Sequence, residues 1–475
     1  MKHFLSLFLF MLGLQLMAQV KTYPYPEGKE GLVPMHDFAV SSLSQEIKTY
    51  QCEVNPHKKV QKASWCQFEA TTDARIRVTK CGGEKIQSAV VRPLSKNIKH
   101  TLVNDSTIEF TVPGVSDNRG YSLEVDINGD REHCLHLFVD GAEKEMYEAP
   151  DPDSKVDINW KTLNNHDVFV QHPRLIYFGP GIHKPHDLPS AEIKIPSGAT
   201  VYIAPGAVVR ARLIVDRVEN VRIVGRGVLL NPLRGVEITY SKNVEIDGLT
   251  VINPQHYTVF GGQSENITVR NVRSFSRHPW SDGFDMMCCK NVTIEDVFLR
   301  NNDDAFAIYN HRWWYWGGTD NIHIRRATIF NDLAHPFNFG SHGDDRSDTG
   351  ELLHNVWIEN CDVLSADCDG IFAVRCGDKN RVEGIHFENI RIEDVVRAAL
   401  FNVQVNFSEK YNRAPGNYIR DIWFKDIYFN GDASRLSPNV MKSYDSIHTV
   451  SDVHFDNIRI NGKKQKIENI PPPMK

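Results

Sequence analysis

The sequence predicts an all-β protein in which a small antiparallel β-sandwich is followed by a parallel β-solenoid. Three observations support this prediction. Short alternating apolar runs lie between turn residues before residue 150, a proline-containing break spans residues 148–153, and one strand motif recurs along the rest of the chain. At roughly 150 residues per domain, a chain of 475 residues has room for two or three domains, or for one small domain beside a long one.

Composition excludes several classes of protein. The chain is 41% hydrophobic, 10% aromatic and 24% charged, which does not fit a disordered, collagen-like or low-complexity chain. A formal net charge of −6 argues against a nucleic-acid-binding protein, because such proteins need a concentrated basic face. We therefore expect no nucleic-acid partner.

Residues 1–18 are predicted to be a secretory signal peptide. A basic start at Lys2 precedes an apolar run over residues 4–16, and small-residue cleavage is expected after Ala18. An uncleaved membrane helix is the alternative, but about 20 apolar residues are needed to span a bilayer and this run is shorter. We expect an exported protein, periplasmic or extracellular in a bacterium, with no later membrane span.

The first domain is expected over residues 19–150. Alternating runs at 74–79, 107–112 and 121–127 are separated by Gly, Asp and Asn turns, which is the pattern of a small antiparallel β-sandwich. Pro150 and Pro152 fit poorly in a central strand, so they indicate a linker to a second domain over residues 151–475.

Nine cysteines are spread over the chain, and no Cys-x-x-Cys pair indicates a zinc site. An odd count leaves at least one thiol unpaired. One or two disulfides are allowed among the four cysteines of the first domain, and the later five are expected to be small buried hydrophobes. The first four are Cys52, Cys66, Cys81 and Cys134.

From about residue 195 a motif recurs that consists of a turn residue, an apolar residue, any residue and a second apolar residue. Nine copies at intervals of 23 to 37 residues, without helical runs between them, indicate a β-solenoid whose alternate residues fill a continuous core. An ordinary sandwich or barrel also has short strands, but nine matches of one pattern make it the weaker interpretation. The copies begin at Asn220, Asn243, Asn266, Asn291, Asn321, Asn355, Gly384, Asp421 and Asp452.

Acidic residues converge where the coils begin to lengthen. Asp282 and Asp303 are 21 residues apart, close to one coil, and residues one coil apart stack at about 4.8 Å. Together with Asp304 they should form one carboxylate cluster, in which repulsion raises the pKa of at least one member. A protonated acid beside ionised bases is what glycoside hydrolysis needs. Turn chemistry and a calcium site are the alternatives, and for Asp285 the turn interpretation is preferred.

Further candidates follow downstream. Glycines on both sides of His342 let the backbone approach a ligand and leave the imidazole accessible, although a lone histidine is more often a surface or satisfied residue. Arg375 lies inside an apolar strand, where its charge needs either a structural carboxylate or a bound sugar. Trp313 and Trp314 begin a run of four aromatics that could line a sugar-binding cleft or pack the inserted loop onto the solenoid.

These motifs resemble the right-handed β-helix glycoside hydrolases of family 28, the polygalacturonases, over about residues 170–460. The family pattern reads Asn-Thr-Asp-Gly, Gly-Asp-Asp, Gly-His-Gly and Arg-Ile-Lys. This chain has W-S-D-G at 280–283, N-D-D at 302–304, S-H-G at 341–343 and R-C-G at 375–377.

The first domain resembles the N-terminal β-sandwich of the related family 49, the dextranases and isopullulanases. The similar segments are residues 90–98, 107–112 and 135–138, and the stretches N-D-D-A at 302–305 and R-A-T-I at 326–329 are also similar to that family.

The resemblance implies a right-handed parallel β-helix and single-displacement, inverting hydrolysis of an α-linked polysaccharide or oligosaccharide, without a metal or other cofactor. Asp303 would be the general acid, and Asp282 and Asp304 would hold and deprotonate the attacking water. His342 would tune Asp303 by hydrogen bonding, and Arg375 would bind sugar near the cleavage point. We expect a monomer.

One departure leaves the substrate open between pectin and a neutral glucan. The lysine of Arg-Ile-Lys, which helps to hold the uronate carboxylate in polygalacturonases, is Gly377 here, although Lys379 or Arg346 could substitute. A lyase of the same architecture, which would need calcium and a basic proton acceptor, and a non-catalytic carbohydrate-binding solenoid are the rival functions.

Overall fold

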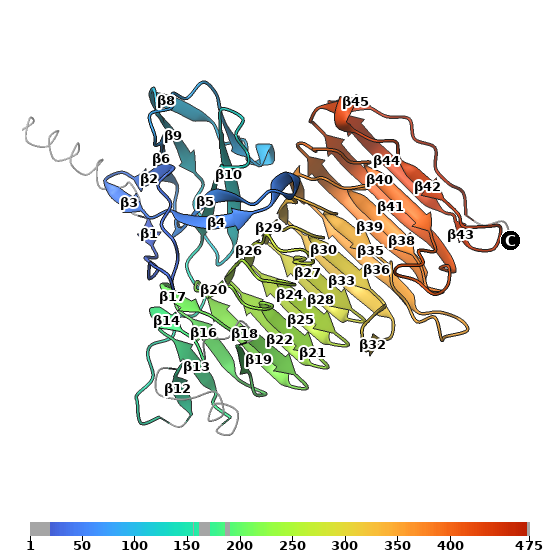
Figure 1. The fold of residues 1–475 in the computed structure, drawn as a ribbon, viewed down its shortest axis with the longest axis horizontal. Coiled ribbons are helices and arrows are strands. Elements are labelled where there is room, and N and C mark those ends of the chain that lie inside the picture. Colours follow the sequence, from blue (N-terminus) through green and yellow to red (C-terminus); the bar gives the residue numbers. More distant parts are fainter. Residues whose placement is uncertain (1–19, 155, 161–171, 186–190, 473–475) are drawn as a thin grey trace, which may run out of the picture. The chain divides into compact units, whose positions relative to one another are not determined.

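The computed structural model describes residues 20–154, 156–160, 172–185 and 191–472 (Figure 1). The predicted signal peptide, residues 1–18, lies outside the described residues. The chain forms two compact units. The first contains residues 20–24, Val33–Gln51 and Ala63–Met146, and the second contains the described residues from Tyr147 onward together with Tyr25–Leu32 and Cys52–Lys62. A single cut near residue 150 therefore does not separate the units, because two earlier segments pack with the second one.

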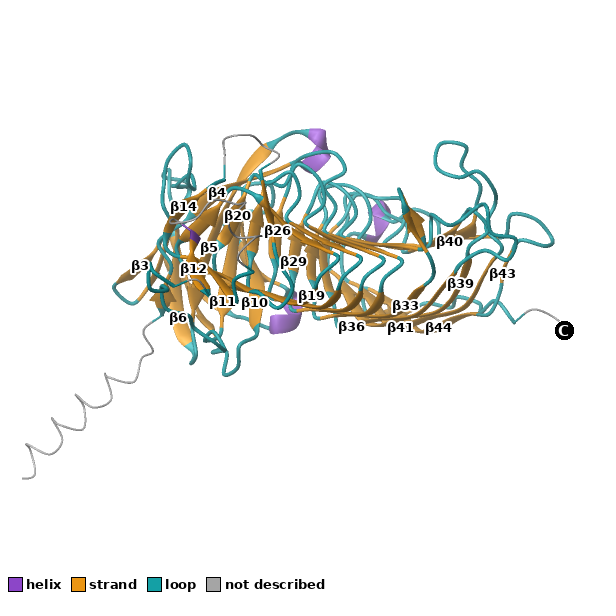
Figure 2. Cartoon of the chain, turned by 90° about the horizontal axis from the view of Figure 1, so that it is seen from below, coloured by secondary structure: helices purple, strands orange, loops and turns teal. Residues whose placement is uncertain are grey.

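The regular secondary structure consists almost entirely of strands, which are joined by loops and turns (Figure 2). Within the described ranges, helical structure is confined to the short 3₁₀ turns η1 (Pro56–Lys58), η2 (Leu94–Lys96) and η4 (Ala433–Arg435). None of these turns is long and apolar enough to cross a bilayer.

The first unit is a sandwich of two mainly antiparallel sheets around one apolar core, and the predicted runs form its strands β6, β9 and β10. Alternate side chains such as Ile76 and Val78 point into that core. One sheet contains β1 (Lys21–Thr22), β5 (Gln61–Glu69), β11 (Leu135–Asp140), β10 (Gly120–Ile127) and β7 (Ala89–Arg92), with β4 (Tyr50–Val54) on β5. The other contains β3 (Gln45–Ile47), β2 (Phe38–Ser42), β6 (Ala74–Lys80), β9 (Thr107–Val112) and β8 (His100–Asn104).

The disulfides that the sequence allowed in the first domain are not formed. All nine cysteines lie in described parts of the chain, and none of them forms a disulfide. Eight of them are buried, and burial raises the pKa of thiols such as Cys66 and Cys361. They therefore act as small apolar core residues, as expected for the later five.

The second unit is a right-handed parallel β-helix with three strands in most coils (Figure 1). The first ladder contains β12 (Asp157–Asn159), β13 (Leu175–Phe178), β16 (Thr200–Ile203), β19 (Glu219–Gly225), β22 (Lys242–Asp247), β25 (Glu265–Arg270), β28 (Lys290–Glu295), β33 (Thr319–Arg325), β36 (Leu352–Glu359), β39 (Arg381–Ile392), β41 (Tyr418–Phe429) and β44 (Val453–Ile460). The predicted solenoid is confirmed.

The second ladder lies beside it in the same sheet, and the third forms a separate sheet. The second contains β14 (Gly181–His183), β17 (Ala207–Val209), β20 (Val228–Leu230), β23 (Thr250–Ile252), β26 (Arg273–Phe275), β29 (Phe298–Arg300), β34 (Thr328–Phe330) and β37 (Asp362–Ser365). The third contains β15 (Glu192–Lys194), β18 (Arg212–Asp216), β21 (Val236–Thr239), β24 (Val259–Gly262), β27 (Phe284–Met287), β30 (Phe306–Tyr309), β35 (Phe337–Phe339), β38 (Phe372–Cys376), β40 (Phe401–Val405) and β42 (Val440–Lys442). The remaining short strands are β31 (His311–Arg312), β32 (Tyr315–Trp316), β43 (Thr449–Val450) and β45 (Lys463–Lys464).

The turn residue that begins each copy of the repeat has a conformational reason. All nine of these positions adopt left-handed backbone with φ between 51° and 64°, a region that Asn, Asp and Gly enter at least cost. Asparagines also stack from coil to coil: the Asn243 Nδ2 donates to Asn220 Oδ1 at 2.9 Å, and the Asn266 Nδ2 donates to Asn243 Oδ1 at 2.9 Å. The same ladder continues through Asn291 and Asn321.

Stacked phenylalanines fix the register of the third ladder. Phe284, Phe306, Phe337, Phe372 and Phe401 face one another on consecutive strands, with ring centroids 5.6–5.8 Å apart. All five rings are fully buried in the core. Because each buried ring fixes its strand, it also fixes the residues immediately before that strand, and the acidic residues of the site lie at these positions.

Candidate active site

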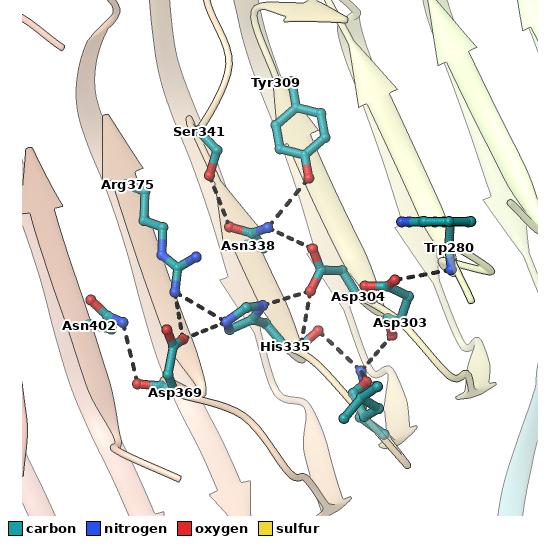
Figure 3. Close-up of polar contacts among 12 residues, drawn as sticks. Trp280, Asp303, Asp304, Tyr309, His335, Asn338, Ser341, Asp369, Arg375 and Asn402 are labelled. Carbon is teal, nitrogen blue, oxygen red and sulfur yellow. Dashed lines mark hydrogen bonds and ion pairs between the residues drawn. The ribbon is translucent and has the colours of Figure 1, made fainter. Parts of the chain in front are cut away.

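Three polar residues occupy equivalent positions on three consecutive coils. Asp282, Asp304 and His335 each lie two residues before a stacked phenylalanine of the third ladder. The sequence placed Asp303 one coil from Asp282, but the residue in register with Asp282 is Asp304. Asp303 extends from the turn just before it (Figure 3).

The predicted carboxylate cluster is present. One oxygen each of Asp282, Asp303 and Asp304 lies within 4.8 Å of the others. All three residues line a cavity of about 310 Å³. Asp282 and Asp304 are each only 6% exposed, so repulsion among these groups is weakly screened by solvent.

Asp303 is held by backbone donors but is difficult to ionise. The backbone N–H groups of Trp280 and Asp304 donate to its two carboxylate oxygens, each at 3.1 Å. Burial, and then the neighbouring charge of Asp304, nevertheless raise the pKa of Asp303 to about 6. Asp303 is therefore largely protonated in mildly acidic solution.

Asp304 has the opposite character because His335 and Asn338 surround it (Figure 3). The backbone N–H of His335 and its Nδ1 contact Asp304 Oδ1 at 2.9 and 2.7 Å, and Asn338 Nδ2 donates to Oδ2 at 2.6 Å. Burial alone would raise the pKa of Asp304, but the charge and hydrogen bonds of His335 lower it below its ordinary value. In the same way, Asp304 raises the pKa of His335 to about 9 against the effect of burial.

A second carboxylate holds the other side of His335. Asp369 Oδ1 lies 2.6 Å from His335 Nε2 and also pairs with Arg375. The hydrogen bond from His335 is the main reason that the pKa of Asp369 lies well below its usual range. The structural carboxylate that the sequence allowed for Arg375 is thus Asp369, and Arg375 still lines the cavity.

Asp285 corrects the turn interpretation made from the sequence. It lies within β27, opposite Ala307, and is completely buried. Across the described parts of the chain its two carboxyl oxygens have no hydrogen-bond partner of good geometry. Burial raises the pKa values of Asp282 and Asp285 well above the usual range, and nearby carboxylates raise them further. A pair of this kind holds at least one proton near neutral pH.

His342 does not make its predicted contact. The sequence predicted a hydrogen bond to Asp303, but His342 Nε2 lies 3.0 Å from Arg312 Nη1, and the His342 ring meets the edge of Tyr309 at 4.9 Å. Burial and the Arg312 charge lower the pKa of His342 to about 3, so this ring is neutral and accepts the hydrogen bond. The histidine on the acidic cluster is His335, which the sequence analysis missed.

The aromatic run forms a hairpin in which β31 pairs with β32. Trp313 stacks on Tyr257 at 5.7 Å and lines a neighbouring cavity of about 400 Å³. Trp314 is 62% exposed and stacks on Trp313. Among the described residues, the exposed rings that line the acidic cavity are instead Trp280, 67% exposed, and Tyr411, 52% exposed.

Arg312, on the same hairpin, carries a charge with no direct counterion. Its guanidinium faces Tyr257 and Tyr309, and within the described ranges it has no carboxylate oxygen at ion-pair distance. The other cations that line the cavity are paired, His335 with two carboxylates and Arg375 with one. Arg312 is thus the described cavity cation without a carboxylate at ion-pair distance, and the carboxyl group that acts on its charge from further away is the buried Asp285.

Comparison with known proteins identifies the family. The sequence profile of the glycosyl hydrolases family 28 matches residues 231–474, just over half of the chain, including the whole acidic cluster. The chain belongs to glycosyl hydrolase family 28. This family 28 protein is therefore an enzyme, a glycoside hydrolase. A second profile, the glycosyl hydrolase family 49 N-terminal Ig-like domain, matches residues 44–150. The resemblance to both families is confirmed.

The relatives of this family 28 enzyme agree with its two-part fold. A dextranase of Arthrobacter sp. (strain CB-8) is 22% identical over 456 residues, covering 75% of this chain and 70% of the dextranase. Dex49A from Penicillium minioluteum superposes with a TM-score of 0.67 and 16% identity, covering 94% of this chain and 93% of its own. A Yersinia enterocolitica family 28 exopolygalacturonase gives a TM-score of 0.52 and 12% identity, covering 82% and 90%. The predicted fold class is confirmed.

Proposed function

We propose that this enzyme hydrolyses α-glycosidic bonds of a polysaccharide by single displacement, with inversion at the anomeric carbon. Asp303 is the general acid that protonates the leaving oxygen. Asp304, together with Asp282, holds the attacking water, and Asp304 accepts its proton. The observation that supports this most is the contrast between two adjacent carboxyl groups, one with a raised pKa and the other with a lowered pKa.

The hydrogen bonds of Asp304 favour water activation over covalent catalysis. Carboxyl groups about 5 Å apart are usual in retaining enzymes, and the nearest oxygens here lie within 4.8 Å. However, both oxygens of Asp304 already accept hydrogen bonds, which reduces their power as carbon nucleophiles. The pKa of Asp282 is raised, which favours its protonated form, and a protonated carboxyl group is a still weaker nucleophile. We therefore assign Asp304 to water and not to a glycosyl-enzyme bond.

The alternative uses of a carboxylate cluster fit less well. A cation would have to compete with donors already in place, because both carboxylate oxygens of Asp303 and of Asp304 accept hydrogen bonds and Asp304 is paired with His335. A lyase would need calcium and a basic acceptor of the sugar-ring proton. A non-catalytic binding solenoid would leave the opposed pKa values of Asp303 and Asp304 without a role.

For the substrate, we propose a polysaccharide with acidic sugar units of the polygalacturonate type. Arg312 is the described cavity cation without an ion-pair partner, and a uronate carboxylate is the planar anion that a guanidinium binds best. It would take the place of the lysine that Gly377 replaces. Arg375 would contact the sugar beside the cleavage point, and Trp313, with Trp314 behind it, would contact units bound in the neighbouring cavity.

Arg312→Gln is expected to lower kcat/KM on polygalacturonate about 10- to 100-fold, because a hydrogen bond to a charged group contributes about 1.5–3 kcal/mol. Reducing ends and the absorbance of unsaturated uronate would be followed on polygalacturonate and dextran, with and without chelator. We expect reducing ends from polygalacturonate alone, no unsaturated product, and no effect of chelator on the wild type.

Arg420→Gln is the matched control, because Arg420 pairs with Glu383 and lines neither the acidic cavity nor the neighbouring one. It should retain wild-type activity. Turnover of dextran in place of polygalacturonate would contradict the acidic substrate. Unsaturated product that disappears with chelator would indicate a lyase.

We also propose that the protein is exported after removal of residues 1–18, which would place it with extracellular or periplasmic polysaccharide, and that it acts as a monomer. The mass of the protein recovered outside the cytoplasm would test the cleavage position.

A further inference from the structure

Trp280 has two properties that the fold does not require. Its side chain is 67% exposed at the rim of the acidic cavity, and its backbone is left-handed, with φ of 58°. Left-handed backbone costs an ordinary residue roughly 1–2 kcal/mol, and a bulky side chain there is uncommon. An indole that remains exposed recovers little of this cost through burial.

The backbone of the same residue explains the turn but not the side chain. The Trp280 N–H donates to Asp303 Oδ2 at 3.1 Å, so the left-handed turn brings a donor to the acid (Figure 3). Glycine or asparagine would supply the same N–H with less strain. The indole must therefore contribute something else, and strained residues of this kind concentrate where a ligand binds.

The ring is chemically suited to a sugar. A flat apolar face packs against the C–H face of a pyranose, while the carboxylates and arginines of the cavity bind its polar groups. Tyr411 gives the same cavity a second exposed ring. Because Asp303 protonates the leaving oxygen in the proposed mechanism, a sugar on the adjacent indole belongs to the leaving-group side.

We propose that Trp280 is a specificity-determining platform that stacks on the sugar unit of the leaving group, and that its left-handed turn aims both the ring and the N–H at the scissile bond. This inference rests on the proposed function, since it places the ring relative to the general acid. In the family pattern Asn-Thr-Asp-Gly, the position of Trp280 is an asparagine. The proposal therefore gives the tryptophan of this chain a binding role of its own.

Two substitutions separate the ring from the turn. Trp280→Asn keeps the N–H donor and suits left-handed backbone, but removes the ring. Trp280→Phe keeps a ring. The binding of oligogalacturonate would be measured by calorimetry in an Asp303→Asn background, so that turnover does not interfere. We expect Trp280→Asn to weaken binding about 10-fold or more and Trp280→Phe to weaken it less than 3-fold.

Stability and pH dependence distinguish a platform from a structural residue. In the otherwise wild-type enzyme, Trp280→Asn should leave Tm unchanged or raise it, and should keep the alkaline limb of the pH profile, because the N–H still bonds Asp303. The proposal would be overturned if Trp280→Asn bound oligogalacturonate as tightly as the Asp303→Asn parent. It would also be overturned if both variants had a lowered Tm and lost the same amount of binding affinity. If Asp303→Asn instead proved active, the general-acid assignment would fail, and the same binding comparison in an Asp304→Asn background would then test the platform.

Discussion

Asp303→Asn is expected to lower kcat by about 10³-fold or more without unfolding the protein. General acid catalysis typically contributes 10²–10⁴-fold, and an amide cannot protonate the leaving oxygen. Asparagine has almost the same volume, and its amide oxygen can accept the hydrogen bonds from the backbone N–H groups of Trp280 and Asp304. Initial rates on polygalacturonate measure the loss, and Tm within about 3 °C of the wild type verifies the fold.

The pH dependence provides an independent test of the same residue. A general acid must be protonated, and the pKa of Asp303 is raised to about 6, so kcat/KM should fall about tenfold per pH unit above pH 6. Since the cluster titrates as a coupled group, this limb reports the apparent pKa of the free enzyme. The residual activity of Asp303→Asn should lack the limb. Asp348→Asn, an exposed carboxylate outside the cavity, is the control. Near-wild-type turnover by Asp303→Asn would contradict the assignment.

His335→Gln is expected to lower both activity and stability. Removing the imidazolium leaves Asp304 buried without its counterion, and breaking a buried ion pair in this way typically costs about 3–5 kcal/mol of unfolding free energy. The pKa of Asp304 should rise at the same time, so the water loses its base and kcat should fall about 10²-fold. Denaturant unfolding at pH 6 and initial rates measure the two effects.

The stability effect should depend on pH with a definite sign. The folded pKa of His335, about 9, lies above its unfolded value near 6.5, so its stabilisation is fully present below pH 6.5 and is lost as the pH rises through 9. The difference in unfolding free energy between wild type and variant should therefore shrink from pH 6 to pH 9.5. His354→Gln, which removes a partly exposed histidine paired with Asp320, should show no comparable change. A difference that stayed constant over this range would contradict the ion pair.

The fold was predictable because its repeat has a local cause. Left-handed backbone at the start of each copy favours Asn, Asp or Gly there, and the alternating core residues that follow are visible in the sequence. Stacking on successive coils likewise made the Asp282, Asp303 and Asp304 cluster predictable. Counting residues did not settle which of two adjacent aspartates is in register with Asp282, because the turns between ladders differ in length by one or more residues.

His335 was missed because no glycine or acidic neighbour marks it. The signal was its position, two residues before an apolar strand residue, as for Asp282 and Asp304. The environments of Asp285 and Arg312 depend on how the inserted hairpin packs on the third ladder. The repeat does not predict such contacts, because the inserted loop does not follow its period. For the same reason, the sequence indicated Trp313 and Trp314 as aromatic residues of the cleft and gave no signal for Trp280 and Tyr411.

The configuration of the first product tests the arrangement of Asp303, Asp304 and Asp282 most directly. Wild-type enzyme would be mixed with an α-linked oligogalacturonate in an NMR tube, and the anomeric protons would be followed before mutarotation equilibrates the new reducing end. Single displacement by a water held against Asp304 predicts that the β-anomer appears first. Initial release of the α-anomer would show retention, and would require a covalent intermediate on one of these carboxylates in place of the water.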